Sequence, residues 1–223
     1  AELAIACEEM GRSLYCGRYF ASAVCGAYAL SATANEANKQ QWLPGIASGD
    51  LIACVAITEH TPMWSDDDIH TAAAVTTNGE YQLSGTKHFV IDAQVADVIF
   101  VAAREADESI SLFAVDAKAD GLSIKPLQSM DATRKLNTLT FSKTGAERLG
   151  RVDLPDLMDY ALVALSNEMI GGAQALLQSA LDYTQLRFQF GRSIASFQAI
   201  KHRLADLLPV SYTHLTLPTT PYV

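Results

Sequence analysis

The strongest constraint on the fold is a helical pattern that runs from Asp156 to about Phe188 without a proline. A helix of this length spans roughly 45 Å at about 1.5 Å per residue, which is typical of a helical bundle. Asp156 and Asp159 stand at its start, where carboxylates cap free amides and meet the positive end of the helix dipole. The apolar residues recur at steps that keep them on one face: Leu162, Leu165, Met169, Ala173, Leu176, Ala180 and Leu181.

A second helix is predicted after a short polar turn. Gly191 is expected to end the first helix, and Ser193 or Ser196 to cap the second. Pro209 is expected to end that second helix, because proline has no N–H to donate. Its apolar positions again share one face: Phe197, Ile200, Leu204 and Leu207.

The first half of the chain combines helices with short strands. Residues 1–50 carry helical patterns, which Leu43-Pro44-Gly45 is expected to break. From Asp50 the period becomes strand-like, and Asn78-Gly79 predicts a two-residue hairpin turn. Short apolar runs at regular spacing predict an antiparallel barrel or sandwich of about 100 residues. The runs are residues 51–57, 71–77, 80–87, 98–103, 110–115, 122–127 and 136–141.

Composition excludes several classes of function. The formal net charge is −9, so that a basic face for nucleic acid is not expected. No run of about 18 apolar residues is present, and no membrane span is expected. The four cysteines lack the spacing of a metal site or a disulfide framework, which favours reduced thiols in a cytoplasmic protein. No metal site is predicted.

Residues 187–192 read Arg-Phe-Gln-Phe-Gly-Arg, and residues 197–200 read Phe-Gln-Ala-Ile. This combination resembles the helix junction of acyl-CoA dehydrogenases, which are flavoproteins. The resemblance implies an α+β multidomain fold, here as an internal fragment of a longer chain. Its parts are the end of a helical N-terminal domain (1–50), a middle antiparallel β-barrel domain (51–152) and the start of a truncated C-terminal helical bundle (153–209). Residues 210–223, rich in Thr and Pro, are expected to be an unstructured or foreign tail.

Residues 56–66 resemble the family's Thr-Glu-Pro motif, which ends in Gly-Ser-Asp. The resemblance implies that Ile57 and Thr58 hold the edge of the flavin of FAD, and that Ser65 meets its pyrophosphate. His60 stands where the family has Pro, and Trp64 where it has Gly. A loop that has lost its cofactor contacts is therefore the alternative.

Residues 85–93 resemble the family's Gly-x-Lys-x-aromatic-Ile-Thr-Asn motif. The resemblance implies that Phe89 packs on the flavin as an aromatic wall. Ile91 matches a position that is usually Thr or Ser, which donates a hydrogen bond to the flavin; Ile offers only its backbone N–H. Barrel core is the alternative for both side chains.

Arg187, Phe190 and Gln198 match the family without change. The resemblance implies that they contact the FAD of a neighbouring subunit, with Arg187 on phosphate. A surface pair at a helix turn is the alternative.

The implied reaction is FAD-dependent α,β-dehydrogenation of an acyl-CoA thioester, in fatty-acid or steroid side-chain β-oxidation. A base removes the α-proton as the β-hydride passes to flavin N5. No catalytic residue is assigned, because the base is expected beyond this chain; Glu168 is interpreted as structural and Gly171-Gly172 as permitting close helix packing.

The implied partners are an electron-transfer flavoprotein or similar acceptor and further subunits of a homo- or hetero-oligomer. The alternatives are a non-catalytic subunit of a hetero-oligomeric acyl-CoA dehydrogenase and a related flavin oxidase or monooxygenase.

Overall fold

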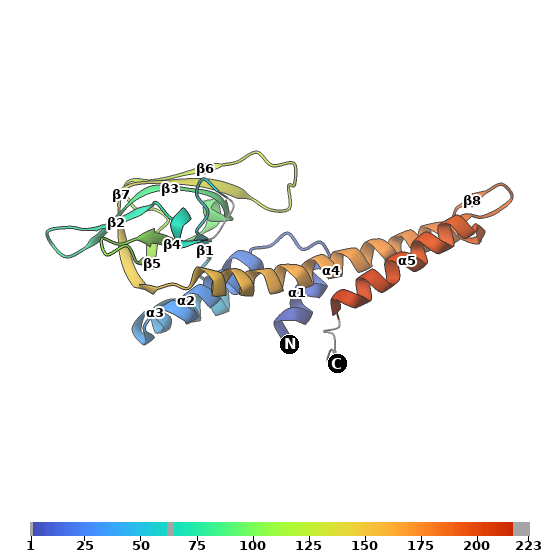
Figure 1. Ribbon diagram of the computed structural model, residues 1–223, viewed down its shortest axis with the longest axis horizontal. Helices are drawn as coiled ribbons and strands as arrows, with labels where there is room; N and C mark the ends of the chain where they lie inside the picture. The colour runs from blue at the N-terminus through green and yellow to red at the C-terminus, as the bar shows by residue number, and fades with distance from the viewer. Residues whose placement is uncertain (1, 62–64, 216–223) are drawn as a thin grey trace. The chain divides into compact units, whose positions relative to one another are not determined.

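The computed structural model describes residues 2–61 and 65–215, with residues 209–215 by their backbone alone. The chain forms two compact units (Figure 1). One unit is Cys16–Leu162, and the other combines Ala1–Tyr15 with Val163–Val223. The boundaries of these units differ from those of the three sequence segments predicted above. Residues 16–50 belong to the same unit as the sheet, and residues 1–15 belong to the same unit as most of the long helix.

The unit of residues 16–162 begins with helices. They are η1 (Phe20–Gly26, a π-helix), α2 (Ala27–Thr33) and α3 (Glu36–Ser48). The break expected at Pro44 is wrong, since α3 continues through it. Residues other than the proline set the two ends of α3. The side chain of Asn35 accepts the N–H of Asn38 at the start, and Gly49 adopts a left-handed φ of 81° at the C-cap.

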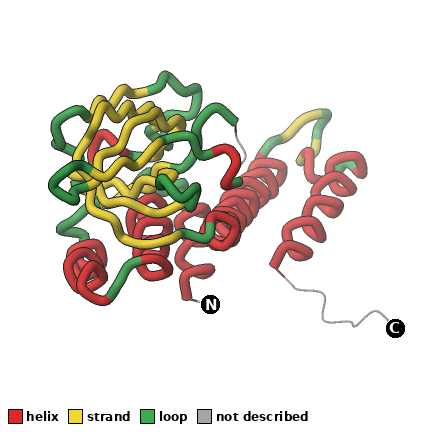
Figure 2. Tube along the Cα trace, turned by 60° about the vertical axis from the view of Figure 1, so that its left-hand side comes forward, coloured by secondary structure: helices red, strands yellow, loops and turns green. Residues whose placement is uncertain are grey.

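Seven strands form one sheet in this unit (Figure 2). They are β1 (Ala53–Ala56), β2 (Ala72–Val75), β3 (Tyr81–Ile91), β4 (Val98–Arg104), β5 (Ile110–Asp116), β6 (Leu122–Pro126) and β7 (Leu136–Arg151). The pairing order is β1-β4-β2-β3-β7-β5, with β6 on β7 and an additional pairing of β5 with β4. Short 3-10 turns, η2 (Asp66–Asp68) and η3 (Ala93–Val95), lie in the connections.

Two of the pairings are parallel, so the expectation of a purely antiparallel sheet is wrong. Strand β1 runs parallel to β4, with Ala53 opposite Val98, and β2 meets β4 in parallel at Ala72 and Arg104. The alternation of apolar residues sets which face a side chain takes, but not the direction of the neighbouring strand. Parallel neighbours need a long connection, and β2 and β3 supply it between β1 and β4.

The turn between β2 and β3 also differs from the expectation. Thr76 N donates to Glu80 O at 2.7 Å, so that residues 77–79 form a three-residue loop. Gly79 alone takes a positive φ, 83°, whereas a two-residue turn of the predicted kind needs a positive φ at both central positions.

Strand β4 separates two apolar clusters. Every residue from Val98 to Ala103 is buried. Val98, Phe100 and Ala102 pack into a cluster with α2, β1 and the residues Leu154 and Leu157 that follow the sheet. Ile99, Val101 and Ala103 pack into a cluster between β3, β5 and β7. Because successive side chains of a strand point to opposite faces, β4 contributes alternate residues to both clusters.

The other unit contains α1 (Glu2–Arg12), most of α4 (Leu154–Leu186) and a second helix, α5 (Gln198–Leu215). Helices α1 and α4 approach closely at glycines, as the sequence predicts. A Cβ on Gly171 would lie 1.8 Å from the carbonyl oxygen of Glu8, and one on Gly11 equally close to that of Glu168. Arg12 spans the same contact, donating to Gln174 at 2.8 Å.

The start and the apolar face of α4 differ from the predictions. Asp153, not Asp156 or Asp159, caps the helix by accepting the N–H of Asp156 at 3.1 Å. Met169 and Leu176, assigned to the packed face, are 67% and 75% exposed. Gly171 is buried instead, because small residues let a neighbouring backbone approach.

The second helix also departs from its predicted limits. Ser193 donates to the carbonyls of Thr184 and Gln185, which end α4, and so does not cap α5. Ser196 donates to the carbonyl of Ser193. The predicted end at Pro209 is wrong, since helix α5 continues through this proline to Leu215. The rest of the predicted tail, residues 216–223, lies outside the described residues.

Candidate functional site

Two segments predicted to face a flavin meet where β1 ends against the middle of β3. The N–H of His88 donates to the carbonyl of Thr58 at 2.8 Å. Lys87 Nζ donates to the carbonyl of Ile57 at 2.9 Å. The structure therefore brings Ile57 and Thr58 next to residues 87–89 of β3, although the two motifs lie about 30 residues apart in the sequence.

Phe89 projects from a bulge in β3. The register with β7 shifts between Lys87 and Val90, and Phe89 takes a left-handed φ of 57°. Its side chain is 58% exposed, so the alternative that it belongs to the core is wrong. A bulge places an extra residue on one strand and re-aims its side chain, which alternation in the sequence does not reveal.

Strand β7 supports this bulge with side chains that sequence reasoning missed. Asn137 is buried, and its Nδ2 donates to the carbonyl of Val90 at 3.2 Å. Thr138 Oγ1 lies 3.3 Å from Nδ1 of His88. The bulge leaves backbone groups without ladder partners, and such side chains take their place.

Ile57 and Ile91 offer different groups to a ligand. The side chain of Ile57 is buried in the core, and its backbone carbonyl accepts a hydrogen bond from Lys87. Ile91 is half-buried and pairs with Leu136 of β7. An isoleucine side chain donates no hydrogen bond, so that Ile91 can only supply packing or its backbone there.

A buried ion pair lies behind these residues. Lys87 Nζ is 2.7 Å from Glu59 Oε1, and both side chains are buried. Burial lowers the pKa of Lys87 to about 8, an effect that Glu59 partly opposes. For Glu59, burial acts to raise the pKa, but the charge and hydrogen bond of Lys87 and the N–H of Thr71 outweigh it, and the pKa is lowered. The pair is thus ionised at neutral pH. Sequence reasoning missed this contact, although a lysine and a glutamate next to the two cofactor motifs were a signal for it.

Ser65 is occupied within its own loop. Its hydroxyl donates to Asp68 Oδ2 at 2.5 Å, and Thr61 Oγ1 donates to Oδ1 of the same carboxylate at 2.6 Å. The hydroxyls of Ser65 and Thr61 lower the pKa of Asp68, which keeps it charged. A negative charge therefore lies at the residue that was expected to meet a pyrophosphate. Trp64 lies outside the described residues.

The three remaining predicted residues, Arg187, Phe190 and Gln198, lie between the end of α4 and the start of α5, which a short hairpin joins (Figure 1). Strands β8 (Phe188–Gln189) and β9 (Arg192–Ser193) enclose a two-residue turn. Phe190 and Gly191 have positive φ values of 53° and 77°, as a type I′ turn requires. Phe190 is 90% exposed.

Arg187 and Gln198 are exposed at the base of the same hairpin. The carbonyl of Arg187 accepts the N–H of Ile194 at 2.8 Å, which closes the hairpin, while its guanidinium remains on the surface. Arg192 lies over the ring of Phe197 at 4.1 Å. The hairpin therefore presents a cation, an aromatic ring and an amide on one exposed segment.

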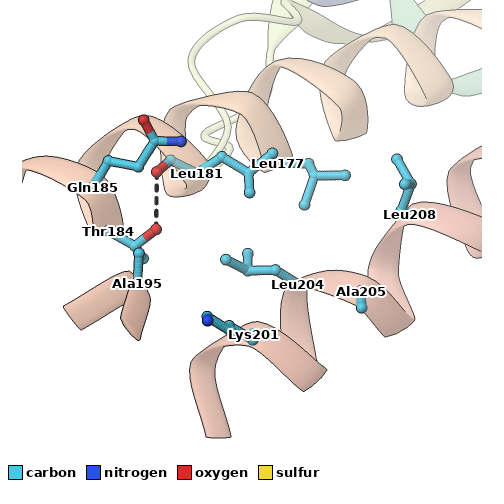
Figure 3. Close-up of a pocket in the computed structure, with 9 residues that line it drawn as sticks. All are labelled: Leu177, Leu181, Thr184, Gln185, Ala195, Lys201, Leu204, Ala205 and Leu208. Carbon is cyan, nitrogen blue, oxygen red and sulfur yellow. Dashed lines mark hydrogen bonds between the residues drawn. The ribbon is translucent and has the colours of Figure 1, made fainter. Parts of the chain in front are cut away.

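A groove of about 260 Å³ lies between α4 and α5 (Figure 3). Its walls are mainly leucines, with Lys201 at one side and Thr184 turned to the carbonyl of Leu181. It holds none of the predicted site residues. Within the described residues, no group of three His, Cys, Asp or Glu is placed to hold a metal, and no helix is long and apolar enough to cross a membrane.

Comparison with known families identifies all three parts of the chain. Models of the acyl-CoA dehydrogenase N-terminal domain, middle domain and C-terminal domain match residues 1–50, 54–144 and 158–210. An acyl-CoA dehydrogenase of Bacillus subtilis (strain 168) is 30% identical over 189 residues, which are 78% of this chain and 49% of the relative.

Solved structures show the same relationship. The ChsE4-ChsE5 complex from Mycobacterium tuberculosis has 26% identity and a TM-score of 0.82, covering 96% of this chain and 60% of that one. A glutaryl-CoA dehydrogenase from Mycobacterium smegmatis in complex with FADH2 shares the fold, with 22% identity and a TM-score of 0.84 over 95% of this chain and 57% of that one. The chain spans about half the length of the curated relatives it matches. This chain belongs to the acyl-CoA dehydrogenase family.

Proposed function

We propose that the protein is an FAD-dependent dehydrogenase that oxidises the α,β carbon–carbon bond of an acyl-CoA thioester. The observation that carries the proposal is the junction of β1 and β3, where the Thr58 carbonyl receives the His88 N–H and Phe89 is held exposed. An exposed aromatic ring beside the backbone of two strand ends suits a flat, hydrogen-bonding ring system.

The residues around this junction fit the flavin ring of FAD in part. Phe89 would pack on one face, and the backbone of Ile57 and Thr58 with the N–H of Ile91 would meet its polar edge. When bound, FAD supplies the acceptor for the hydride that leaves the β-carbon. The role of the described chain is to orient that ring and keep water from it.

The hairpin residues would serve a second subunit. Arg187 would bind a phosphate of the neighbouring subunit's FAD, Phe190 would cover its adenosine, and Gln198 would donate amide hydrogen bonds. All three side chains are exposed within their own chain, as this assignment requires. A homo- or hetero-oligomer is therefore part of the proposal.

The remaining parts of the reaction are assigned to the rest of the protein. The α-proton would go to a carboxylate outside these 223 residues. Glu59 is not a candidate for this role, because it is buried and paired with Lys87. A soluble protein such as an electron-transfer flavoprotein would take the electrons. The proposed setting is fatty-acid or steroid side-chain β-oxidation in the cytoplasm.

A non-catalytic subunit of a hetero-oligomer is the second candidate. The Ser65 hydroxyl is bound to the charged Asp68, and Ile91 has no hydroxyl for the flavin. A chain with these features would donate its hairpin to a partner's FAD and bind its own weakly. A chain with this fold occurs in the ChsE4-ChsE5 complex from Mycobacterium tuberculosis.

The test is dye reduction by the full-length protein with a panel of acyl-CoA thioesters, read together with bound flavin. Turnover by the protein alone supports the enzyme. Flavin and turnover that need a second, different subunit support the non-catalytic role. The absence of flavin with and without a partner would overturn both. The 223-residue chain alone is expected to give no turnover.

A further inference from the structure

Lys87 ties together the two segments assigned to the flavin. It is fully buried in β3, and its ammonium donates both to the Ile57 carbonyl at 2.9 Å and to Glu59 at 2.7 Å. One side chain thus holds the backbone on one side of Thr58 and the carboxylate on the other.

The carboxylate of Glu59 extends the same contact to a third strand. Its Oε1 accepts the N–H of Thr71 at 2.9 Å, and its Oε2 accepts the N–H of His70 at 3.0 Å. Both backbone groups immediately precede β2. The carboxylate therefore joins the chain after β1 to the start of β2 while Lys87 joins it to β3.

Glu59 and Lys87 are direct neighbours in the sequence of the residues at the candidate site. Glu59 follows Thr58, and Lys87 precedes His88 and Phe89. The His88–Thr58 hydrogen bond lies between them. Phe89 holds a φ of 57°, which is unfavourable for a bulky residue, so its position depends on the residues that fix β3 on either side.

We propose that Glu59 and Lys87 are a positioning pair that sets the distance between the Ile57–Thr58 edge and the Phe89 wall of the flavin site. Both side chains are buried and act through the backbone and through Phe89, without touching the cofactor. This inference rests on the proposed function, because it needs a flavin at this junction.

The test is FAD binding to the full-length protein, measured by fluorescence titration and by the visible circular dichroism of the bound flavin. Lys87→Met removes the ammonium and keeps an unbranched chain; Glu59→Gln keeps an acceptor for the backbone N–H groups. Both are expected to weaken FAD binding by about tenfold or more, as second-layer substitutions do at other cofactor sites, and to change the flavin dichroism.

Glu105→Gln is the matched control. Glu105 is also a carboxylate paired with a cation of the same sheet, Arg148 at 2.8 Å, and it accepts hydrogen bonds from the hydroxyls of Ser111 and Tyr81. It should leave the affinity within about twofold and the dichroism unchanged.

The outcomes separate the two proposals. If the wild-type protein binds no FAD, the proposed function fails and the inference with it. If the wild type binds FAD and the folded Glu59→Gln and Lys87→Met variants bind it equally well with the same dichroism, only the inference fails. Should Lys87→Met not fold, Glu59→Gln decides alone, since it leaves a hydrogen-bonding side chain in place.

Discussion

The Nζ of Lys87 lies 2.7 Å from Oε1 of Glu59, and both side chains are buried. A buried ion pair of this kind adds little stability over a well-packed apolar pair, but breaking one partner costs about 3–5 kcal/mol. Its presence beside the candidate site is thus better explained by the geometry that it imposes on residues 57–59 and 87–89.

The first prediction concerns alkaline pH. The folded Lys87 has a pKa of about 8 because burial disfavours its charge, whereas the ordinary value is 10.5. Between these values the unfolded chain binds more protons at this lysine, so the free energy of unfolding rises with pH by at most about 1.4 kcal/mol per unit. Urea denaturation should show the wild type gaining stability relative to Lys87→Met from pH 8 to 10.5. A constant difference between the two would contradict the assigned pKa.

At acid pH, the protonation of Glu59 should destabilise the folded protein. Burial acts against its charge, but Lys87 and the backbone N–H groups lower its pKa below 4.5 in the folded chain. Its stabilisation is present above 4.5 and is lost as pH falls through the folded pKa. The stability difference between wild type and Glu59→Gln should therefore shrink below pH 4.5, and one that stays constant there would count against the pair.

Phe89 should show a conflict between stability and cofactor binding. Phe89→Gly relieves the left-handed φ of 57° and is expected to stabilise the flavin-free protein by about 0.5–1 kcal/mol, after the larger entropy of glycine in the unfolded chain is subtracted. Phe89→Ala keeps the unfavourable φ and should bring no such gain. Both should weaken FAD binding, measured by titration. Unchanged affinity in both would remove Phe89 from the site.

The glycine pair in α4 provides a matched comparison. A Cβ at Gly171 would meet the carbonyl of Glu8 at 1.8 Å, whereas one at Gly172 would meet that of Gly11 at an ordinary 3.6 Å. Gly171→Ala should therefore destabilise the α1–α4 contact by about 1–3 kcal/mol, while Gly172→Ala should be neutral or stabilising because alanine favours helices. Thermal unfolding measures both, and equal effects would disprove the close approach.

The hairpin tip can be tested without disturbing its turn. Phe190→Asn suits the positive φ of 53° and should keep the stability within about 1 kcal/mol, since asparagine is favoured in type I′ turns. It removes the exposed ring, so that FAD retained by the assembled protein on gel filtration should fall. Full retention of flavin would show that the hairpin does not contact it.

The helical hairpin and its glycines could be predicted from the sequence because local signals determine them. A proline-free amphipathic run gives α4, and the small Gly171 permits close packing; Gly191, however, lies in the turn between β8 and β9 and does not end α4, which stops at Leu186. The packed face of α4 could not be predicted in the same way. Apolar periodicity identified Met169 and Leu176, but the contact with α1 uses small residues that a hydrophobic pattern ignores.

The sequence predicted which residues belong to the candidate site, but not how they are arranged. Motif resemblance named Thr58 and Phe89, and the structure joins Thr58 to the residue before Phe89, because the N–H of His88 donates to the carbonyl of Thr58. The register shift that exposes Phe89 and the buried partner of Lys87 depend on pairing between distant strands. Alternation alone places Lys87 and Phe89 on the same face of β3, whereas the bulge between Lys87 and Val90 leaves Lys87 buried and Phe89 exposed.

The most direct test of the flavin site is hydrogen–deuterium exchange of the full-length protein with and without FAD. Saturating FAD is predicted to slow amide exchange in peptides that cover residues 56–60 and 88–92, while peptides from β5 keep their rates. Exchange that slows only elsewhere, or does not change while FAD is bound, would contradict the assignment of the β1–β3 junction as the flavin wall.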